Sequence, residues 1–507
     1  MNQQEVRVRF APSPTGPLHI GGVRTALYNY LFAKKNGGKM ILRIEDTDQT
    51  RFVDGAEDYI IKSLEWCGIQ FDESVVKGGE YGPYRQSERK ELYRKYADEL
   101  IEKGWAYYAF DTAEELDKLR SEYESRKETF TYNATVRNNL RTSLAMTQDE
   151  VKSLIEAGTP FVVRFKMPED DELVMHDIIR KEVKVRTSAL DDKILFKSDG
   201  MPTYHLANIV DDHLMKISHV IRGEEWLPSM PLHVMLYKAF GWDAPEFAHL
   251  PLLLKPDGPG KLSKRDGDRL GFPVFPMEWK DPKSGDISSG YRESGYFADA
   301  FINMLAFLGW NPGTEQEIFS MDELIAAFSL DRVGKSGSRF DPDKAKWFNH
   351  QYMQSHDVAE VANQFKEFLA EKGIAAADQY IQKVVGMVRE RATFVADLWD
   401  QSSFFFAAPE TFDAKFVKKR WKENSPELLR GVRVVIENHS EFITAEVKPN
   451  IEQFVEEQGC GFGPIMNIFR LALVGAGKGP DLFEIAEMLG KEEVLRRIDY
   501  ALETIKK

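Results

Sequence analysis

The hydrophobic pattern of residues 6–44 predicts a strand, a helix and a second strand. Apolar and polar side chains alternate over residues 6–10, and apolar ones recur every three or four positions over residues 23–31, the period of one helix face. Residues 39–44 form a second apolar run, followed by the acidic sequence EDTD. Between the first strand and the helix, residues 9–22 form a turn rich in proline and glycine, with the sequence RFAPSPTGPLHIGG. Such a βαβ unit predicts that the helix points its dipole and free backbone N–H groups at an anion.

His19 lies at the start of this helix and has two interpretations. In the first, it stands at the mouth of an anion site, where the neighbouring glycines let the backbone approach a phosphate closely. In the second, the turn is structural and His19 only caps the helix. The local sequence supports both interpretations equally.

Two further helices are predicted in residues 1–110. Apolar positions recur with a helical period over residues 55–67. After a glycine-rich loop, Ser87 has the side chain of a helix N-cap, and the helix that follows would end at Gly104 with an apolar face formed by Leu92, Tyr96, Leu100 and Ile101. We interpret residues 1–110 as the first half of a nucleotide-binding domain.

The pattern changes at residues 111–193 and predicts an α+β insertion. The segment is polar with helical periodicity up to about residue 159. Alternation typical of antiparallel strands follows at residues 161–167 and 183–185. The insertion would separate the two halves of the nucleotide-binding domain.

The second half of this domain is predicted at residues 194–270. Residues 204–209 start a helix or end an inward-facing strand, while residues 217–221 and 247–254 are apolar enough to be buried strands. Polar sequences follow both strands, RGEEW after the first and KPDGPG with KLSKR after the second. Because open α/β sheets bind ligands where their strands end, these residues are candidates for a site.

The remainder of the chain is predicted to be helical apart from one segment. Residues 271–295 are rich in glycine, proline and serine, and we expect a surface insertion that is ordered only in part. From residue 296 onwards, apolar positions recur with a helical period almost throughout. The predicted fold class is α/β with an α+β insertion, followed by an all-α half that divides into residues 271–345 and 346–507.

Composition fits a protein of several domains. Of the 507 residues, 43% are hydrophobic and 29% are charged. No apolar run approaches the roughly 18 residues of a membrane span, and the N-terminus lacks the apolar region of a signal peptide. Two cysteines, Cys67 and Cys460, are too few for a disulfide framework or a thiolate zinc site. We therefore expect a cytoplasmic protein.

The net charge of −14 argues mildly against a polyanionic partner. Basic residues nevertheless cluster at residues 180–186, 255–269 and 415–422. Each cluster by itself is more often a solvated face than a binding site, so charge leaves the partner open.

Common nucleotide and metal motifs are absent. There is no GxGxxG, no HExxH and no clustered set of His and Cys ligands. Residues 474–479, VGAGKG, resemble a phosphate loop, but Gly479 stands where Walker A has Ser or Thr, and Ala472 also departs from the motif. We interpret this segment as a loop between helices.

Two short motifs bear on the chemistry, HIGG at residues 19–22 and KLSKR at residues 261–265. In this order, after the first and the last strand of the sheet, they resemble the HIGH and KMSKS motifs of class I aminoacyl-tRNA synthetases. The resemblance narrows to the bacterial glutamyl-tRNA synthetases through the longer stretches FAPSPTGPLHIGG, LRIEDTD, GPYRQSER, DGMPTYHLANIVDDH and VIRGEEW. It covers most of residues 6–350 in the family's order and is looser in the helical remainder.

This resemblance implies that ATP activates L-glutamate to glutamyl-adenylate, which then esterifies the 3′ end of tRNA(Glu). Activation is an in-line attack of a carboxylate on the α-phosphate, which requires positioning and cancellation of phosphate charge. His19, Lys261 and Lys264 are the implied catalytic residues. His19 would donate to the phosphates, and the lysines would close over the transition state on a mobile loop. Mg²⁺ is implied as the companion of ATP and needs no dedicated protein ligands.

The substrate-binding residues are implied by the same resemblance. Arg9 and Arg222 stand at the ends of predicted buried strands, where a guanidinium fork matches a substrate carboxylate. Ser13 and Glu45 would hold the α-ammonium group, and a buried Arg9–Glu45 ion pair is the alternative. The implied glutamate-binding residues are Arg9, Ala11, Ser13, Glu45, Tyr204, Asn208 and Arg222. The implied ATP-binding residues are Pro12, Gly16, His19, Gly21, Gly22, Glu225, Trp226, Leu253, Lys261, Ser263, Lys264 and Arg265.

The domain order of the family implies roles for the other regions. The catalytic domain would be of Rossmann type, residues 111–193 would contact the tRNA acceptor arm, residues 271–345 its stem and residues 346–507 its anticodon arm. The inserted domain of the family sometimes holds zinc, but residues 105–132 contain no cysteine, so we predict none. We expect a monomer that binds tRNA(Glu), ATP and L-glutamate, and no membrane.

Four alternative functions fit the sequence less well. A glutaminyl enzyme would have β-barrels after the KMSKS-like motif, and Arg222 favours an anionic side chain. A truncated relative that glutamylates a tRNA base lacks the helical half, which is present here. A nucleotidylyltransferase acting on a small molecule would have no need of this half. A non-catalytic tRNA-binding scaffold would have no use for both His19 and the KLSKR lysines. Whether tRNA(Gln) is also charged stays open.

Overall fold

The opening βαβ unit forms as its hydrophobic pattern predicts. In a computed structural model, which describes residues 5–459 and 461–506, β1 (Arg7–Phe10) and β2 (Lys39–Leu42) pair in parallel and are joined by α1 (Ile20–Lys35). Every residue of β1 is buried, including both arginines. Because both faces of the strand are covered, Arg7 and Arg9 must find partners inside the protein.

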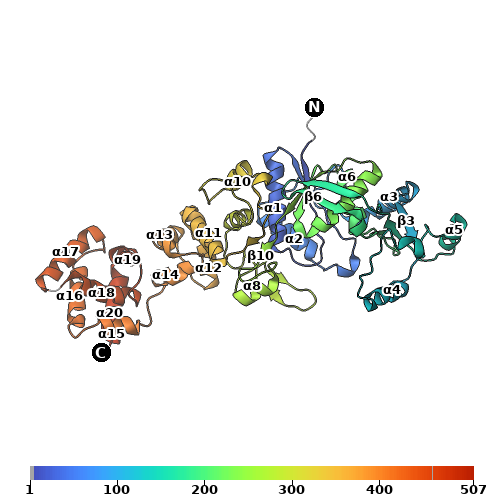
Figure 1. The fold of residues 1–507 in the computed structure, drawn as a ribbon. Coiled ribbons are helices and arrows are strands. Elements are labelled where there is room, and N and C mark those ends of the chain that lie inside the picture. Colours follow the sequence, from blue (N-terminus) through green and yellow to red (C-terminus); the bar gives the residue numbers. More distant parts are fainter. Residues whose placement is uncertain (1–4, 460, 507) are drawn as a thin grey trace. The chain divides into compact units, whose positions relative to one another are not determined.

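The main sheet continues with strands from distant parts of the chain. Its order is β6 (Lys181–Arg186), β5 (Glu172–Asp177), β9 (Glu246–Leu250) and β8 (His219–Gly223). Strand β9 pairs in parallel with both β5 and β8, and the N–H of Ser218, next to β8, donates to the carbonyl oxygen of Arg7 in β1 at 2.9 Å. The strand predicted at residues 217–221 is confirmed, and the one predicted at 247–254 forms mainly as β9, which lies beside it. Figure 1 shows β6, the edge strand of this sheet, within the predominantly green and blue region of the molecule.

Two helices frame β8 in the sequence. Residues 204–209 lie in α6 (Tyr204–Leu214), which settles the alternative left open there in favour of a helix. Helix α7 (Met230–Phe240) follows β8 after a 3₁₀ turn and ends at Gly241, whose φ of 77° is accessible to glycine without strain.

A separate antiparallel sheet is built around the insertion. Its order is β3 (Ala106–Ala109), β4 (Val162–Phe165) and β7 (Ile194–Phe196), so its outer strands lie just outside residues 111–193. Helices α4 (Ala113–Ser125) and α5 (Gln148–Glu156) each begin with a capping box of threonine and glutamate. The hairpin of β5 and β6 belongs instead to the main sheet (Figure 1).

Helix α2 (Ala56–Trp66) forms as predicted, whereas α3 (Lys90–Glu102) starts later than predicted. Ser87 lies in a 3₁₀ turn, where its N–H and its hydroxyl donate to the Asp46 carboxylate at 2.8 and 2.6 Å. The prediction of Ser87 as the N-cap was therefore wrong, because Asp46 from the loop after β2 binds this side chain. The buried face of α3 consists of Tyr93, Ala97 and Leu100.

The expectation of a partly ordered surface insertion at residues 271–295 was wrong, because the segment is packed into the protein. Its buried apolar side chains are Phe272, Val274, Phe275, Met277, Trp279 and Tyr291. The Tyr59 hydroxyl of α2 binds the N–H and the carbonyl oxygen of Met277, and the Trp279 ring lies edge-on to that of Tyr59 at 5.1 Å. The exposed part is the tip between β11 (Trp279–Lys280) and β12 (Ile287–Ser288). Glycine, proline and serine shape the turns, while the side chains between them fill the core.

The KLSKR motif follows β10 (Leu253–Leu254), a short strand that pairs in parallel with β13 (Ser338–Arg339) from later in the chain. Its lysine at position 264 begins α8 (Lys264–Leu270). Between these strands in the sequence lie α9 (Ala298–Ala306) and α10 (Met321–Ala327). This region thus combines the predicted helices with a strand that supports β10.

The chain divides after Ala345 into two compact units, and the second is helical throughout its described residues, as predicted. Helix α11 (Pro342–Ser355) crosses the division. The others are α12 (Val358–Glu371), α13 (Asp378–Val388), α14 (Asp397–Phe406), α15 (Ala414–Arg420), α16 (Ser425–Glu437), α17 (Thr444–Glu457), α18 (Phe462–Val474), α19 (Leu482–Leu489) and α20 (Lys491–Thr504) (Figure 1). Residues 475–481 link α18 to α19, which confirms the loop predicted at residues 474–479 apart from Val474, the last residue of α18.

Two further observations concern the cysteines and the length of the helices. Cys67 is a buried thiol, and burial raises its pKa. Cys460 lies outside the described residues. Within the part of the chain that the structure describes, no helix is long and apolar enough to cross a membrane.

Candidate functional site

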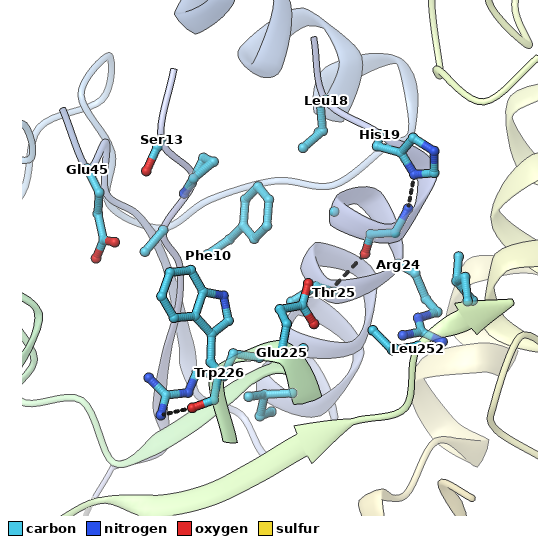
Figure 2. A pocket seen from close by; sticks show the side chains of 18 of the residues that line it. Phe10, Ser13, Leu18, His19, Arg24, Thr25, Glu45, Glu225, Trp226 and Leu252 are labelled. Atoms are coloured by element: carbon cyan, nitrogen blue, oxygen red, sulfur yellow. Dashed lines mark hydrogen bonds between the residues drawn. The ribbon is translucent and has the colours of Figure 1, made fainter. Parts of the chain in front are cut away.

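A cavity of about 460 Å³ lies where β1, β8 and β9 end. Its walls come from the last residues of β1 and β8, from residues that follow the three strands, and from the first turns of α1 and α6. Figure 2 shows its two ends, with Glu45 and Ser13 at one, His19 and Arg24 at the other, and Trp226 in the part between. Ligands of open α/β sheets bind at such an edge.

The structure brings most of the residues proposed from the sequence to this cavity. Its lining includes Arg9, Ala11, Ser13, Glu45, Tyr204, Asn208 and Arg222 from the glutamate set, and Pro12, His19, Gly21, Gly22, Glu225, Trp226, Leu253 and Lys261 from the ATP set. Gly16 and Lys264 line an adjoining cavity of about 500 Å³, which shares His19 with the first. Ser263 and Arg265 line neither of these two cavities.

His19 caps α1, as the structural interpretation predicts, and its second ring nitrogen is left without a partner among the described residues. Its Nδ1 accepts the N–H of Gly21 at 3.3 Å. In the neutral ring the proton is then on Nε2, which is buried and has no partner among the described residues. Burial, assisted by the charge of Lys261, lowers the pKa of His19 to about 4. The ring is therefore neutral at pH 7, and its Nε2–H group can donate to an anion.

The backbone N–H groups at the start of α1 are not free, so the prediction of an anion site built from them was wrong. Ile20 donates to the carbonyl oxygen of Val274 at 3.0 Å, and the next three N–H groups all donate to His19, one to its side chain and two to its carbonyl oxygen. Val274 belongs to the packed segment 271–295, whose Phe275 ring also lies edge-on to His19 at 6.0 Å. An anion would therefore meet the His19 side chain and nearby lysines.

The two lysines of KLSKR line the two cavities that meet at His19. Lys261 lines the first, where its Nζ lies 3.0 Å from Oε1 of Glu225. Lys264 lines the second, together with Asp281 of the packed segment. Both ammonium groups can therefore approach a phosphate chain that extends past His19.

Ser263 and Arg265, which were assigned to ATP, lie outside the lining of both cavities, and their roles stay predictions. The Ser263 hydroxyl and N–H donate to Oδ2 of Asp266 at 2.6 and 3.0 Å, which caps α8. Arg265 is exposed in the first turn of that helix. The motif thus starts a helix here, with Ser263 as its N-cap.

Arg9 pairs with Asp212 of α6, so the alternative of an Arg9–Glu45 ion pair was wrong. Its Nε and Nη2 lie 3.1 and 3.2 Å from the two carboxylate oxygens. Burial alone would lower the pKa of Arg9, but Asp212 outweighs it and raises the pKa, which keeps the guanidinium charged. Nη1 has no partner among the described residues, and Arg9 lines the cavity.

Glu45 is held by Arg43, a fully buried arginine that sequence reasoning missed. Arg43 donates from Nη2 to Oε1 of Glu45 at 2.9 Å and from Nη1 to Oδ1 of Asp212 at 2.8 Å. Asn208 also donates to Oε1 of Glu45, at 3.0 Å, which leaves its own Oδ1 buried without a partner among the described residues. Glu45 and Asn208 both line the cavity, where their remaining acceptor oxygens suit an ammonium group.

Arg222 is a buried cation whose partners carry no negative charge. Its Nε donates to Nε2 of His249 at 3.0 Å. Its Nη1 contacts the Tyr204 hydroxyl at 3.0 Å and Nδ1 of His233 at 3.2 Å, and its Nη2 donates to the carbonyl oxygen of Trp226 at 3.3 Å. Burial and the nearby cation lower the pKa of His233 well below its usual range, so this ring is neutral. A buried guanidinium with such partners is suited to bind an anion.

Arg24 is a second lining residue that sequence reasoning missed. It donates from Nη1 to the carbonyl oxygen of Leu308 at 2.7 Å and from Nη2 to that of Pro251. Burial lowers its pKa. A charged residue within the apolar pattern of α1 is the one signal that could have indicated it. Arg43 and Asp212, which lie within the quoted stretches LRIEDTD and DGMPTYHLANIVDDH, had the same kind of signal.

Comparison with known proteins gives two family matches that together span most of the chain. Residues 5–347 match the family described as tRNA synthetases class I (E and Q), catalytic domain, and residues 359–502 match the anticodon binding domain. The glutamate–tRNA ligase of Christiangramia forsetii is 58% identical over 502 residues, which cover 99% of each chain. That of Flavobacterium johnsoniae is also 58% identical, over 99% of this chain and 100% of its own. A crystal structure of a glutamate tRNA ligase from Elizabethkingia meningosepticum, in complex with its amino acid, covers 99% of this chain and 100% of its own, with a TM-score of 0.97 and 55% identity.

Proposed function

The chain belongs to the class I tRNA synthetases for glutamate and glutamine, and we propose that the cavity at its strand ends activates L-glutamate with ATP. Its relatives over the full length are glutamate–tRNA ligases, so its activity is the ligation of glutamate to tRNA. In the first step, the α-carboxylate of glutamate attacks the α-phosphate of ATP, forms glutamyl-adenylate and releases pyrophosphate. In the second, the glutamyl group passes to the 3′ end of tRNA(Glu). The observation that carries this assignment of the cavity is the charge of Arg222, which is balanced by no carboxylate among its partners.

One end of the cavity supplies a complementary group for each charge of glutamate. Arg222 and the Tyr204 hydroxyl would bind the side-chain carboxylate, which leaves the open Nη1 of Arg9 for the α-carboxylate. Glu45 and Asn208 would accept the ammonium protons, with Ser13 beside them and Ala11 as an apolar wall. Each of these charges is fixed by buried partners before the substrate arrives, which reduces the cost of ordering the site.

The other end would hold the phosphates of ATP. His19 would donate from Nε2, and Lys261 and Lys264 would neutralise the charge that moves onto pyrophosphate as it leaves. Glu225 would hold Lys261 until ATP replaces it as the partner. Gly16, Gly21, Gly22 and Pro12 would form the floor, while Leu253 and Trp226 would bound the nucleoside.

Mg²⁺ would enter the site with ATP. The described residues contain no group of three or more His, Cys, Asp and Glu side chains that could hold a metal ion. Mg²⁺ commonly keeps its waters and binds phosphate oxygens, and there it would offset phosphate charge. The absence of zinc stays a prediction, which elemental analysis of the purified protein would test.

We further propose that different regions of the chain bind different parts of the tRNA. Residues 1–110 and 194–270 would form the catalytic domain, residues 111–193 would contact the acceptor arm, residues 271–345 the stem and residues 346–507 the anticodon arm. The anticodon binding domain match at residues 359–502 supports the last assignment. The protein would act as a cytoplasmic monomer without a membrane partner.

Aminoacylation of purified tRNA tests the function. The protein with ATP, Mg²⁺ and radiolabelled glutamate should esterify tRNA(Glu), whereas labelled glutamine should give no product. Esterification by glutamine would contradict the role of Arg222. A parallel assay with tRNA(Gln) would show whether the helical half accepts a second anticodon.

A further inference from the structure

We infer that Asp177 and His249 are positioning residues for glutamate recognition, because they fix the orientation of the Arg222 guanidinium. This inference rests on the proposed role of Arg222 as the ligand of the side-chain carboxylate. Neither residue lines the cavity. Both act from behind Arg222, on the side that faces the protein core.

The three side chains form one buried chain of contacts. Oδ2 of Asp177 lies 2.7 Å from Nδ1 of His249, and Nε2 of His249 lies 3.0 Å from Nε of Arg222. Asp177 and His249 are fully buried, and Arg222 is 5% exposed. A contact at Nε sets the plane of the guanidinium, so it also sets the direction of the two terminal nitrogens.

The order of hydrogen-bond donors and acceptors along Asp177, His249 and Arg222 allows only one tautomer of His249. Arg222 can only donate, so Nε2 must accept and the single proton of the neutral ring must lie on Nδ1. The Asp177 carboxylate accepts that proton and stabilises this tautomer. Burial and the charge of Arg222 lower the pKa of His249, although the hydrogen bond to Asp177 opposes this, so the ring stays neutral and Nε2 stays an acceptor.

Asp177 is itself held by donors on every side. Its Oδ1 accepts the N–H groups of Ile179 and Arg180 at 2.9 and 2.7 Å, and its Oδ2 accepts the N–H of His249 at 3.1 Å. Arg180 in the same turn donates to the carbonyl oxygens of His249 and Lys335, at 3.2 and 2.6 Å. The turn at the end of β5 thus holds His249 in two ways. Asp177 binds the ring and the backbone N–H of His249, and Arg180 binds its carbonyl oxygen.

The substitution Asp177→Asn would reverse this order. All four contacts of Asp177 are with N–H donors, but an asparagine offers one oxygen and one NH₂ group. If the NH₂ group faces His249, it donates to Nδ1 and moves the ring proton to Nε2, where it meets the N–H of Arg222. Replacing an aspartate behind a histidine is known to select the wrong tautomer in this way in the serine proteases.

Two variants of His249 separate positioning from general packing. In His249→Gln the side-chain amide reaches the place of Nε2, and its oxygen can accept from Arg222. In His249→Asn the amide reaches only the place of Nδ1, and Arg222 loses its acceptor. The readouts are the KM values for glutamate and ATP in pyrophosphate exchange with tRNA(Glu) present, with the melting temperature as a check on folding. Arg222→Ala is the reference variant, and Glu182→Gln, an exposed change on the neighbouring strand β6, is the control.

We expect His249→Asn and Asp177→Asn to raise the glutamate KM about tenfold or more, the loss typical of a hydrogen bond to a charged group. The ATP KM should stay within about twofold, and His249→Gln should stay within about threefold of the original glutamate KM. Because glutamine has no tautomers, Asp177→Asn should add nothing in the His249→Gln background.

The outcomes separate this inference from the proposed function. If Arg222→Ala raises the glutamate KM but His249→Asn behaves like the control, the inference is overturned. Equal loss in His249→Gln and His249→Asn, or equal changes in both KM values, would also overturn it in favour of a packing role. If Arg222→Ala leaves the glutamate KM unchanged, the proposed function of Arg222 fails first. The glutamine and asparagine pair decides the question even where Asp177→Asn does not fold.

Discussion

Arg9 and Asp212 face one another, with Nε and Nη2 of the arginine 3.1 and 3.2 Å from the carboxylate oxygens. The same carboxylate also accepts a hydrogen bond from Nη1 of Arg43 at 2.8 Å. One buried aspartate therefore balances two buried arginines, and it connects Arg9 to Glu45 through Arg43. Arg9 and Glu45, two proposed ligands of the amino acid, are thus both positioned by Asp212, Arg9 directly and Glu45 through Arg43.

Asp212→Asn should destabilise the fold, because it leaves Arg9 and Arg43 close together without their shared carboxylate. Breaking a buried charge pair costs about 3–5 kcal/mol, and urea unfolding at pH 7 would measure it. Asp58→Asn is the matched control, since Asp58 pairs with Lys62 on the surface and its loss should cost less than about 1 kcal/mol. Equal losses in the two variants would argue against a supporting role for Asp212.

Substitutions of His19 should separate its cap from its donor. His19→Asn keeps an acceptor for the N–H of Gly21 but lacks a donor at Nε2, so we expect normal stability and pyrophosphate exchange slower by about 10²-fold. His19→Gln keeps a donor near Nε2 and loses the cap, which should cost about 1 kcal/mol of stability and less activity. The reverse ranking of exchange rates would mean that the cap is what matters.

The packing of residues 271–295 can be measured with two substitutions in one hairpin. Trp279 is buried against Tyr59, so Trp279→Ala should lower the free energy of unfolding by about 3 kcal/mol or more. Ile287 is 64% exposed, and Ile287→Ala should change it by less than about 0.5 kcal/mol. A small effect at both positions would fit a loose surface insertion instead.

Stability should fall in mild acid because His19 and His205 are buried as neutral rings. Burial lowers the pKa of each to about 4, whereas a histidine in an unfolded chain titrates near about 6.5. Between these values the unfolded chain binds more protons, so the contribution is fully present above pH 6.5 and is lost as the pH falls toward 4. The slope approaches about 1.4 kcal/mol per pH unit for each ring.

Urea unfolding at pH 7 and pH 5 would measure this loss. His205→Asn should reduce the difference between the two pH values, because asparagine does not titrate and still offers an acceptor to His233. An unchanged difference in this variant would show that His205 does not contribute.

The sequence predicted the helices and strands that depend on the local pattern of hydrophobic residues. The βαβ unit, the strands that precede the site and the helical second half follow from hydrophobic periods, and these elements are confirmed. Most of the cavity-lining residues were implied by the resemblance to the glutamyl-tRNA synthetases, which rests on the two short motifs and the longer stretches around them. Position at the end of a predicted buried strand independently indicated only Arg9 and Arg222.

Partners from distant parts of the chain could not be predicted in this way. Asp212 lies 203 residues after Arg9, and the Asp177 that supports His249 comes from a hairpin within residues 111–193. The N–H of Ile20 is bound by a carbonyl oxygen of the segment that looked like a surface insertion. A hydrogen bond to a backbone carbonyl oxygen does not depend on the residue type, so a sequence pattern cannot predict it. The many glycines of residues 271–295 suggested an exposed loop, although the aromatic residues between them are buried.

The central claim is that Arg222 recognises the side-chain carboxylate of glutamate. The most direct test is the KM for glutamate and for ATP of Arg222→Ala in pyrophosphate exchange with tRNA(Glu) present. Loss of a buried charge partner should weaken glutamate binding by about 3 kcal/mol, which raises its KM about 100-fold or more, and the ATP KM should stay within about twofold. Equal changes in the two KM values, or an unchanged glutamate KM, would contradict the account.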